Sequence, residues 1–291
     1  MRSRMKRATA LTAVLLLAAP LAPAQAAEGA RYGLMADIIY DNNATRGLYA
    51  ADIKSDTIVT VEGSVSRSLL ISPTSGALFR ATARYSHFLD IEDISNLAIL
   101  GRASYRIQPG GGFSAPWYEI AGQAVWLQHA DSELRDGTIL TVEAGAGSHV
   151  TDRVRLSAGI ALDERDGGGT AGLYDLSTNR IWAAAELRAG LRNTLYARLT
   201  RLDGDHVFNS VTVSGLSPVW EPDPAFIDVF GRPTDSYRLD ATSYLYELGF
   251  NYPLGRSDSI DVSLSGFQTK SDTALKYDGM QLRAAYVYRF R

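Results

Sequence analysis

The feature that most restricts the fold of this chain is an alternation of apolar and polar residues along most of its length. After residue 30 no helical period is present, whereas stretches of roughly ten residues alternate with a period of two. That period is the spacing of side chains on a β-strand. Twelve such stretches are present, at 31–40, 57–70, 77–88, 95–107, 116–129, 138–150, 153–163, 178–190, 193–203, 238–252, 258–270 and 278–290. The sequence therefore predicts an all-β protein with an even number of strands.

The connections between these stretches are sorted by length. Every second connection is short, at 72–76, 108–115, 150–153, 191–194 and 254–258. The remaining connections include the three longest, at 41–56, 163–177 and 204–237. Short turns at one end and long loops at the other are typical of a transmembrane β-barrel whose termini lie at the end with the short turns. A soluble β-sandwich also has many alternating strands, but nothing in that fold sorts its loops in this way.

Each stretch has one uncharged apolar row and one row that carries the charges. For example, Ile181, Ala183 and Ala185 alternate with positions that include Glu186 and Arg188. Aromatic residues gather at the ends of the stretches, where a membrane has its interfaces: Tyr32, Tyr40, Tyr85, Tyr105, Tyr118, Tyr252 and Phe290. We therefore predict a single antiparallel transmembrane β-barrel of about 12 strands, with apolar rows against lipid and charged rows facing a wet interior.

The start of the chain predicts its compartment. A basic segment at 1–7 precedes a short apolar run at 8–21 and an Ala-x-Ala site at 24–26, which together describe a secretory signal peptide. We expect cleavage after Ala26, a barrel over 27–291, and a location in the outer membrane of a Gram-negative bacterium. Cysteine is absent, so disulfides and thiolate metal sites are excluded.

The charge of the mature chain limits its partners. Removal of the signal peptide leaves 25 basic and 32 acidic residues, a balance that argues against a nucleic-acid partner. Acidic residues predominate in the long loops, which leaves the strands and short turns basic. The acidic loops either remain solvated or bind divalent cations that bridge them to phosphates of the outer leaflet.

The end of the chain resembles the C-terminal recognition signal of bacterial outer-membrane barrels. That signal has a polar residue, a small residue and then alternating aromatic residues that end in Phe. The matching residues here are Arg283, Ala285, Tyr288 and Phe290. Ala285 stands where Gly is commoner, and Arg291 follows the terminal Phe. The resemblance implies that Tyr286, Tyr288 and Phe290 form an insertion signal for the barrel-insertion machinery, and that outer-membrane lipid surrounds the protein.

The charged rows are predicted to line the interior. Their members are Arg80, Arg84, Arg102, Arg106, Arg155, Arg180, Arg188, Arg198, Arg283, Arg289, Glu119, Glu143, Glu186 and Glu247. In one interpretation the excess of arginine lines a narrow channel for a small anionic solute, and the chain then resembles small twelve-stranded channels that pass acidic sugars. In the other, the charges pair across strands and close a barrel that is barely wide enough for a channel. A closed barrel would have a structural, adhesion or surface-assembly role.

The longest connection combines large apolar residues with acidic ones. Its notable residues are Trp220, Glu221, Asp223, Phe226, Asp228 and Phe230. Exposed aromatic side chains favour a covered position, and arginines in the lumen would attract the carboxylates. We expect this segment to fold over the outer mouth as a constriction. A surface for recognition by a partner is the alternative.

An enzymatic role is the weakest hypothesis. An outer-membrane lipid hydrolase needs a serine within reach of a histidine, and the His-x-Ser-Asn-Gly run of the outer-membrane phospholipases is absent. In such an enzyme His129, which points inward by parity, would be the base. We assign no catalytic residue and no metal site, and we expect no cofactor.

Overall fold

The computed structural model describes residues 29–110, 112–168, 172–190, 192–210, 226–229 and 233–290. Its strands are β1 (Ala30–Asp41), β2 (Asp56–Ser72), β3 (Ser75–Phe88), β4 (Asn96–Ile107), β5 (Trp117–His129), β6 (Gly137–His149), β7 (Val154–Gly167), β8 (Leu176–Ala189), β9 (Asn193–Ser210), β10 (Phe226–Val229), β11 (Pro233–Pro253), β12 (Asp258–Ser271) and β13 (Lys276–Phe290). Two 3-10 helices, η1 (Glu92–Ile94) and η2 (Glu133–Arg135), follow β3 and β5. No helix in these ranges is long and apolar enough to cross a membrane.

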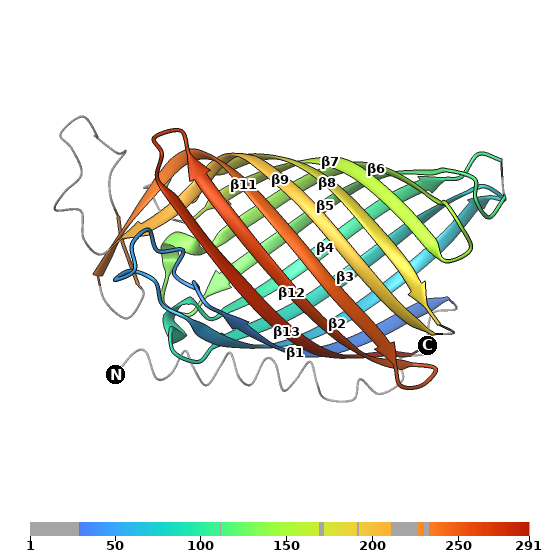
Figure 1. Ribbon diagram of the computed structural model, residues 1–291, viewed down its shortest axis with the longest axis horizontal. Helices are drawn as coiled ribbons and strands as arrows, with labels where there is room; N and C mark the ends of the chain where they lie inside the picture. Colours follow the sequence, from blue (N-terminus) through green and yellow to red (C-terminus); the bar gives the residue numbers. More distant parts are fainter. Residues whose placement is uncertain are drawn as a thin grey trace.

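The strands close into one antiparallel barrel (Figure 1). Strands β1 to β9 pair in order, β9 pairs with β11, and the circle returns through β12 and β13 to β1. β10 pairs only with 233–236 of β11 and is not part of the circle. The barrel therefore has 12 strands, which confirms the predicted fold.

The two faces of the wall have opposite character. Apolar side chains of one parity point outward and are more than half exposed, as for Ile160, Ile181 and Leu248. Polar side chains of the other parity point inward and are buried, as for Glu62 and Thr141. In water the outward rows would be a large unprotected apolar surface, whereas lipid tails are their preferred surroundings.

The last strand completes the barrel by pairing with the first one. β13 lies antiparallel to β1, from Tyr32 opposite Phe290 to Asp41 opposite Gln281. The rings of Tyr32 and Phe290 stack with their centroids 5.5 Å apart. Tyr286 and Tyr288 share the outward face of β13 with Phe290, and all three are exposed. The aromatic row at the end of the sequence therefore lies on the lipid-facing side of the seam that closes the barrel.

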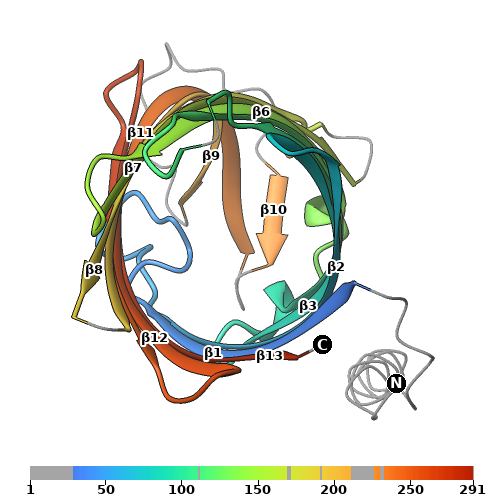
Figure 2. The ribbon, with the colours of Figure 1, turned by 90° about the vertical axis from the view of Figure 1, so that its right-hand side faces the viewer.

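Strands β9 and β11 continue past the rim. β8 pairs with β9 no further than Gly204, whereas β9 and β11 remain paired as far as Ser210 and Asp235. The predicted loop 204–237 is wrong at both ends, because each of these two strands supplies the hydrogen-bond partners of the other. In Figure 1 the extension stands beyond the left end of the barrel, and in Figure 2 β10 lies within the outline of the ring, so β10 lies across the outer mouth.

Candidate functional site

A continuous series of ion pairs crosses the inner face of β4 to β8. We call it the charge belt, and it consists of Arg106–Glu119 (2.7 Å), Glu119–Arg102 (3.2 Å), Arg102–Glu143 (3.4 Å), Glu143–Arg180 (3.6 Å) and Arg180–Asp163 (3.3 Å). Each carboxylate and each arginine except Arg106 is at least half-buried. Because acid and base alternate along the belt, its charges largely neutralise one another.

Three smaller groups include five of the remaining predicted charges, Arg80, Arg84, Arg155, Glu186 and Arg283. Glu62 on β2 lies 2.6 Å from Arg84 and 3.6 Å from Arg80 on β3. Arg155 on β7 pairs with Glu186 on β8. The third group joins three strands at the seam of the barrel: Arg283 on β13 lies 3.1 Å from both Asp37 on β1 and Asp261 on β12.

Some of the inward charges lie apart from any opposite charge. In the described ranges, Arg188, Arg198, Arg289 and Glu247 have no ion-pair partner within 4.0 Å. Arg198 and Glu247 are directly opposite one another in the pairing of β9 with β11. The register alone would therefore pair them, and a neighbouring side chain must explain why they remain separate.

That neighbour is Trp182 on β8. The guanidinium carbon of Arg198 lies 4.7 Å from the centre of the indole ring, within the range of a cation–π contact. The ring rests on Gly159, because a Cβ at that position would come within 2.7 Å of the indole. The indole Nε1 is buried and has no hydrogen-bond acceptor in the described structure. Sequence reasoning missed Trp182, although its inward parity beside Arg180 was a usable signal.

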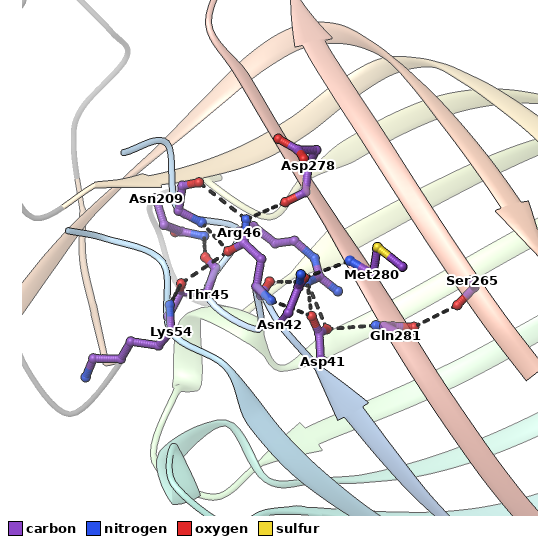
Figure 3. A network of polar contacts seen from close by, with 12 residues as sticks. Asp41, Asn42, Thr45, Arg46, Lys54, Asn209, Ser265, Asp278, Met280 and Gln281 are labelled. Carbon is purple, nitrogen blue, oxygen red and sulfur yellow. Dashed lines mark hydrogen bonds and ion pairs between the residues drawn. The ribbon is translucent and has the colours of Figure 1, made fainter. Parts of the chain in front are cut away.

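The connection between β1 and β2, residues 42–55, folds into the outer mouth and is the second feature that sequence reasoning missed. Figure 2 shows this β1–β2 loop inside the ring of strands. The amide of Asn43 donates to the carbonyl oxygen of Asp278 on β13 (2.8 Å), and the amide of Asn209 on β9 donates to that of Thr45 (2.7 Å). The loop is thus fastened to two strands across the mouth (Figure 3).

The anchoring contacts are buried and specific. Asn43 and Asn209 are 1% and 3% exposed, so removing either amide would leave a buried group without its partner. Arg46 pairs with Asp41 at 2.9 Å and lies over the ring of Phe267 at 4.2 Å. Gly47 approaches the backbone of Asp52 so closely that a Cβ would lie 2.6 Å from its carbonyl carbon. These contacts give the β1–β2 loop a defined conformation.

The predicted constriction segment is placed only in part. Trp220, Glu221, Asp223 and Phe230 lie outside the described residues, and Phe226 and Asp228 belong to β10 by their backbone. The prediction that this segment narrows the mouth stays a prediction. The β1–β2 loop, in contrast, enters the mouth with defined side-chain contacts.

Three histidines have polar partners in the described structure, and the one beside His87 is Ser95, with 3.3 Å between Oγ and Nδ1. His129 contacts Asp136, with 3.3 Å between Nδ1 and Oδ1, and not a serine. His206 Nε2 lies 2.8 Å from Ser243 Oγ, and its Nδ1 lies 2.9 Å from the carbonyl oxygen of Gly204. Ser243 is buried on β11, which pairs on both sides with β9 and β12. Its strand N–H groups are used in the sheet, so this place offers no pair of donors for an oxyanion.

Comparisons with known proteins give a fold and no narrower family. No protein-family model matches the chain, and no curated protein sequence matches it. Among solved structures it is similar to the COG4313 outer membrane channel from Pseudomonas putida F1, with a TM-score of 0.60 and 8% identity over 90% of this chain and 96% of that chain.

Two further structures have lower scores. The KdgM porin in complex with disordered oligogalacturonate has a TM-score of 0.49 and 7% identity, over 89% of this chain and 99% of that chain. The CymD monoaromatic hydrocarbon channel has a TM-score of 0.48 and 12% identity, over 93% and 92%. These three proteins are channels or porins. Identities this low establish the barrel fold alone.

Proposed function

We propose that this protein is an outer-membrane channel for small anionic solutes. The observation that carries the proposal is the group of inward arginines without a carboxylate partner, Arg188, Arg198 and Arg289. A pore lined by such side chains has a positive potential and admits anions more readily than cations. Arg198 is the central member, because the contact with Trp182 separates it from Glu247.

The same proposal includes a route to the membrane. The chain is exported by its N-terminal signal peptide, which is removed after Ala26. The barrel-insertion machinery reads Tyr286, Tyr288 and Phe290 at the end of β13, and the outward rows then contact outer-membrane lipid. The exposure of these three aromatic side chains supports this part of the proposal.

The outer mouth is narrowed by the β1–β2 loop, with the β9–β11 extension and β10 above it. The hydrogen bonds of Asn43 and Asn209 hold the β1–β2 loop in place. A solute would therefore pass the β1–β2 loop before it reached the arginines of the wall. In this arrangement the mouth selects by size and the arginines select by charge.

A closed barrel is the second candidate, and the charge belt favours it. Paired side chains from β4 to β8 fill space that a pore would need, and the β1–β2 loop fills part of the mouth. Such a protein would have a structural, adhesion or surface-assembly role. The two candidates predict opposite results in a conductance measurement.

The test is the ion selectivity of the purified barrel in planar lipid bilayers. We expect discrete conductance steps and, across a gradient of KCl, a reversal potential that reports a preference for chloride. The variant Arg198→Gln should shift the reversal potential toward zero. Arg67→Gln is the matched control, because Arg67 is exposed on the outward face of β2, and it should behave as the unmodified protein does.

Each of the other results has a definite meaning. An absence of conductance from folded protein would support the closed barrel. Conductance with a cation preference, or with equal effects of Arg198→Gln and Arg67→Gln, would contradict the role of the unpaired arginines.

A further inference from the structure

Two lysines lie directly opposite one another on the outer face of the barrel. Lys270 near the end of β12 pairs in register with Lys276 at the start of β13. Both side chains are exposed, and both belong to the outward rows that include Leu264 and Leu282. Beyond residue 26 the only other lysine is Lys54. Like charges at directly opposite positions destabilise a sheet, so this arrangement calls for an opposite charge.

The protein does not supply that charge at close range. No carboxylate in the described ranges lies within the 4.0 Å of an ion pair from either lysine. Asp278 follows two positions after Lys276 on the same face. Asp203 is already held by Arg201 (2.8 Å) and by the hydroxyl of Thr242 (2.7 Å). Two ammonium groups therefore remain available to an external anion.

The depth of the lysines indicates what that anion is. Thr242 lies beside Lys270 in one outward row, and Gln268 lies beside Asp278 in the next row. These are the two polar rows nearest the loop end of the barrel. The next outward row contains Leu199, Tyr246 and Met280. Rows on one face are ~7 Å apart along a strand, so the lysines lie just above the start of the apolar band. In a membrane this is the level of the lipid headgroups.

The outward positions around Lys270 and Lys276 differ in charge from the rest of the same rim. The corresponding outward positions on β2 to β8 include Thr57, His87, Leu97, Gln128, Thr138 and Asn179, and β7 adds Glu164. None of these is a lysine or an arginine. The loops at this end are also predominantly acidic. On β9 the outward Arg201 is paired with Asp203, so the two lysines are the unpaired cations of an otherwise neutral or acidic surface among these described positions.

We propose that Lys270 and Lys276 bind a phosphate group of an outer-leaflet glycolipid, with the side-chain amide of Gln268 beside them as a hydrogen-bond donor. Lysine is a compact point charge that suits phosphate, and a bound phosphate removes the repulsion between the two ammonium groups. This inference depends on the outer-membrane location in the proposed function, but not on whether the barrel conducts. One lipid molecule would then be held at a fixed place on the outward face of β11 to β13.

The test measures lipid binding to the full barrel folded in detergent, by native mass spectrometry. The probes are lipid A with both phosphates, lipid A from which the phosphates have been removed, and phosphatidylglycerol. We expect the form with two phosphates to bind most tightly. The double variant Lys270→Gln/Lys276→Gln should bind it roughly 30-fold more weakly, the effect of two lysines near a charged lipid surface. Lys270→Arg/Lys276→Arg should retain binding.

The control is again Arg67→Gln, an outward cation of the opposite rim, which should leave the affinity unchanged. Circular dichroism of every variant establishes that the barrel has folded. Equal binding by the double glutamine variant and the unmodified protein would overturn the inference. Equal affinity for phosphatidylglycerol or for the lipid without phosphates would also overturn it. Because this measurement needs no conductance, its failure is distinguishable from failure of the channel proposal.

Discussion

The charge belt and the Arg198–Glu247 region are built from the same residue types but differ in how the charges meet. In the belt, Arg102 reaches both Glu119 and Glu143 on neighbouring strands. Arg198 and Glu247 are also opposite on neighbouring strands, yet Arg198 lies over Trp182 instead. Alternation therefore decides which face a charge occupies, whereas its neighbours decide whether that charge is neutralised. One wall of the interior is largely neutral as a result, and the other keeps an arginine that can attract an anion.

The largest effect should come from a charge placed on the outward face of a strand that carries the charge belt on its inner face. Ala158 on β7 is exposed on the outward face, and Ser157 beside it points inward. Ala158→Arg should lower the free energy of unfolding by ~2–4 kcal/mol if it lies near the middle of the membrane, and Ser157→Arg should cost less. Urea unfolding in lipid vesicles measures both values. Equal costs would show that the belt does not lie on the inner face.

Removing the central acid of the belt should have an intermediate effect. Glu143 is the carboxylate shared by Arg102 and Arg180, and its side chain is 16% exposed. Glu143→Gln leaves two half-buried arginines with a weaker partner, which should cost about 1–3 kcal/mol in the free energy of unfolding. The same unfolding experiment measures it. A cost near zero would mean that the ion pairs of the belt do not stabilise the barrel. The belt and the Arg198–Glu247 region would then not differ in their effect on the free energy of unfolding.

The smallest effect is expected at Glu247. This side chain has no ion-pair partner in the described structure, so Glu247→Gln should change the free energy of unfolding by less than ~0.5 kcal/mol. The same variant should increase the preference for anions, because it removes a negative charge beside Arg198. Unfolding and reversal-potential measurements check the two effects. A large loss of stability would indicate that Glu247 and Arg198 pair in the membrane.

The fold and the sorting of faces could be predicted from the sequence because both depend on local information. The alternation around Ala183 and Glu186 is complete within one strand, and short turns fix which strands are neighbours. Ion pairs between arginines and carboxylates on neighbouring strands are one of the two interpretations that the sequence leaves open. Which arginine would remain unpaired could not be foreseen, because it depends on the indole of Trp182 and the absence of a side chain at Gly159.

The outer mouth was predicted less well, for a different physical reason. The contact between Thr45 and Asn209 joins residues 164 positions apart in the chain, and no local pattern encodes such a contact. The expected loop 204–237 begins too early, although Gly and Asp are residues typical of a turn. In the structure Gly204 lies within β9, with a φ of 134° that a side chain would rarely adopt. The strand continues there because β11 pairs with it.

The seam between β1 and β13 has a consequence for the time course of folding. Its register joins Tyr32 to Phe290 and Asp41 to Gln281, so the outer edges of the first and last strands are paired only when these two strands meet. Such pairing between distant segments is slow, because the entropy of closing a very long loop is lost before the contacts are gained. Until it forms, β1 and β13 each expose an unpaired edge that invites association with other chains. A carrier that shields these two edges would therefore protect the chain more effectively than one that binds any of the inner hairpins.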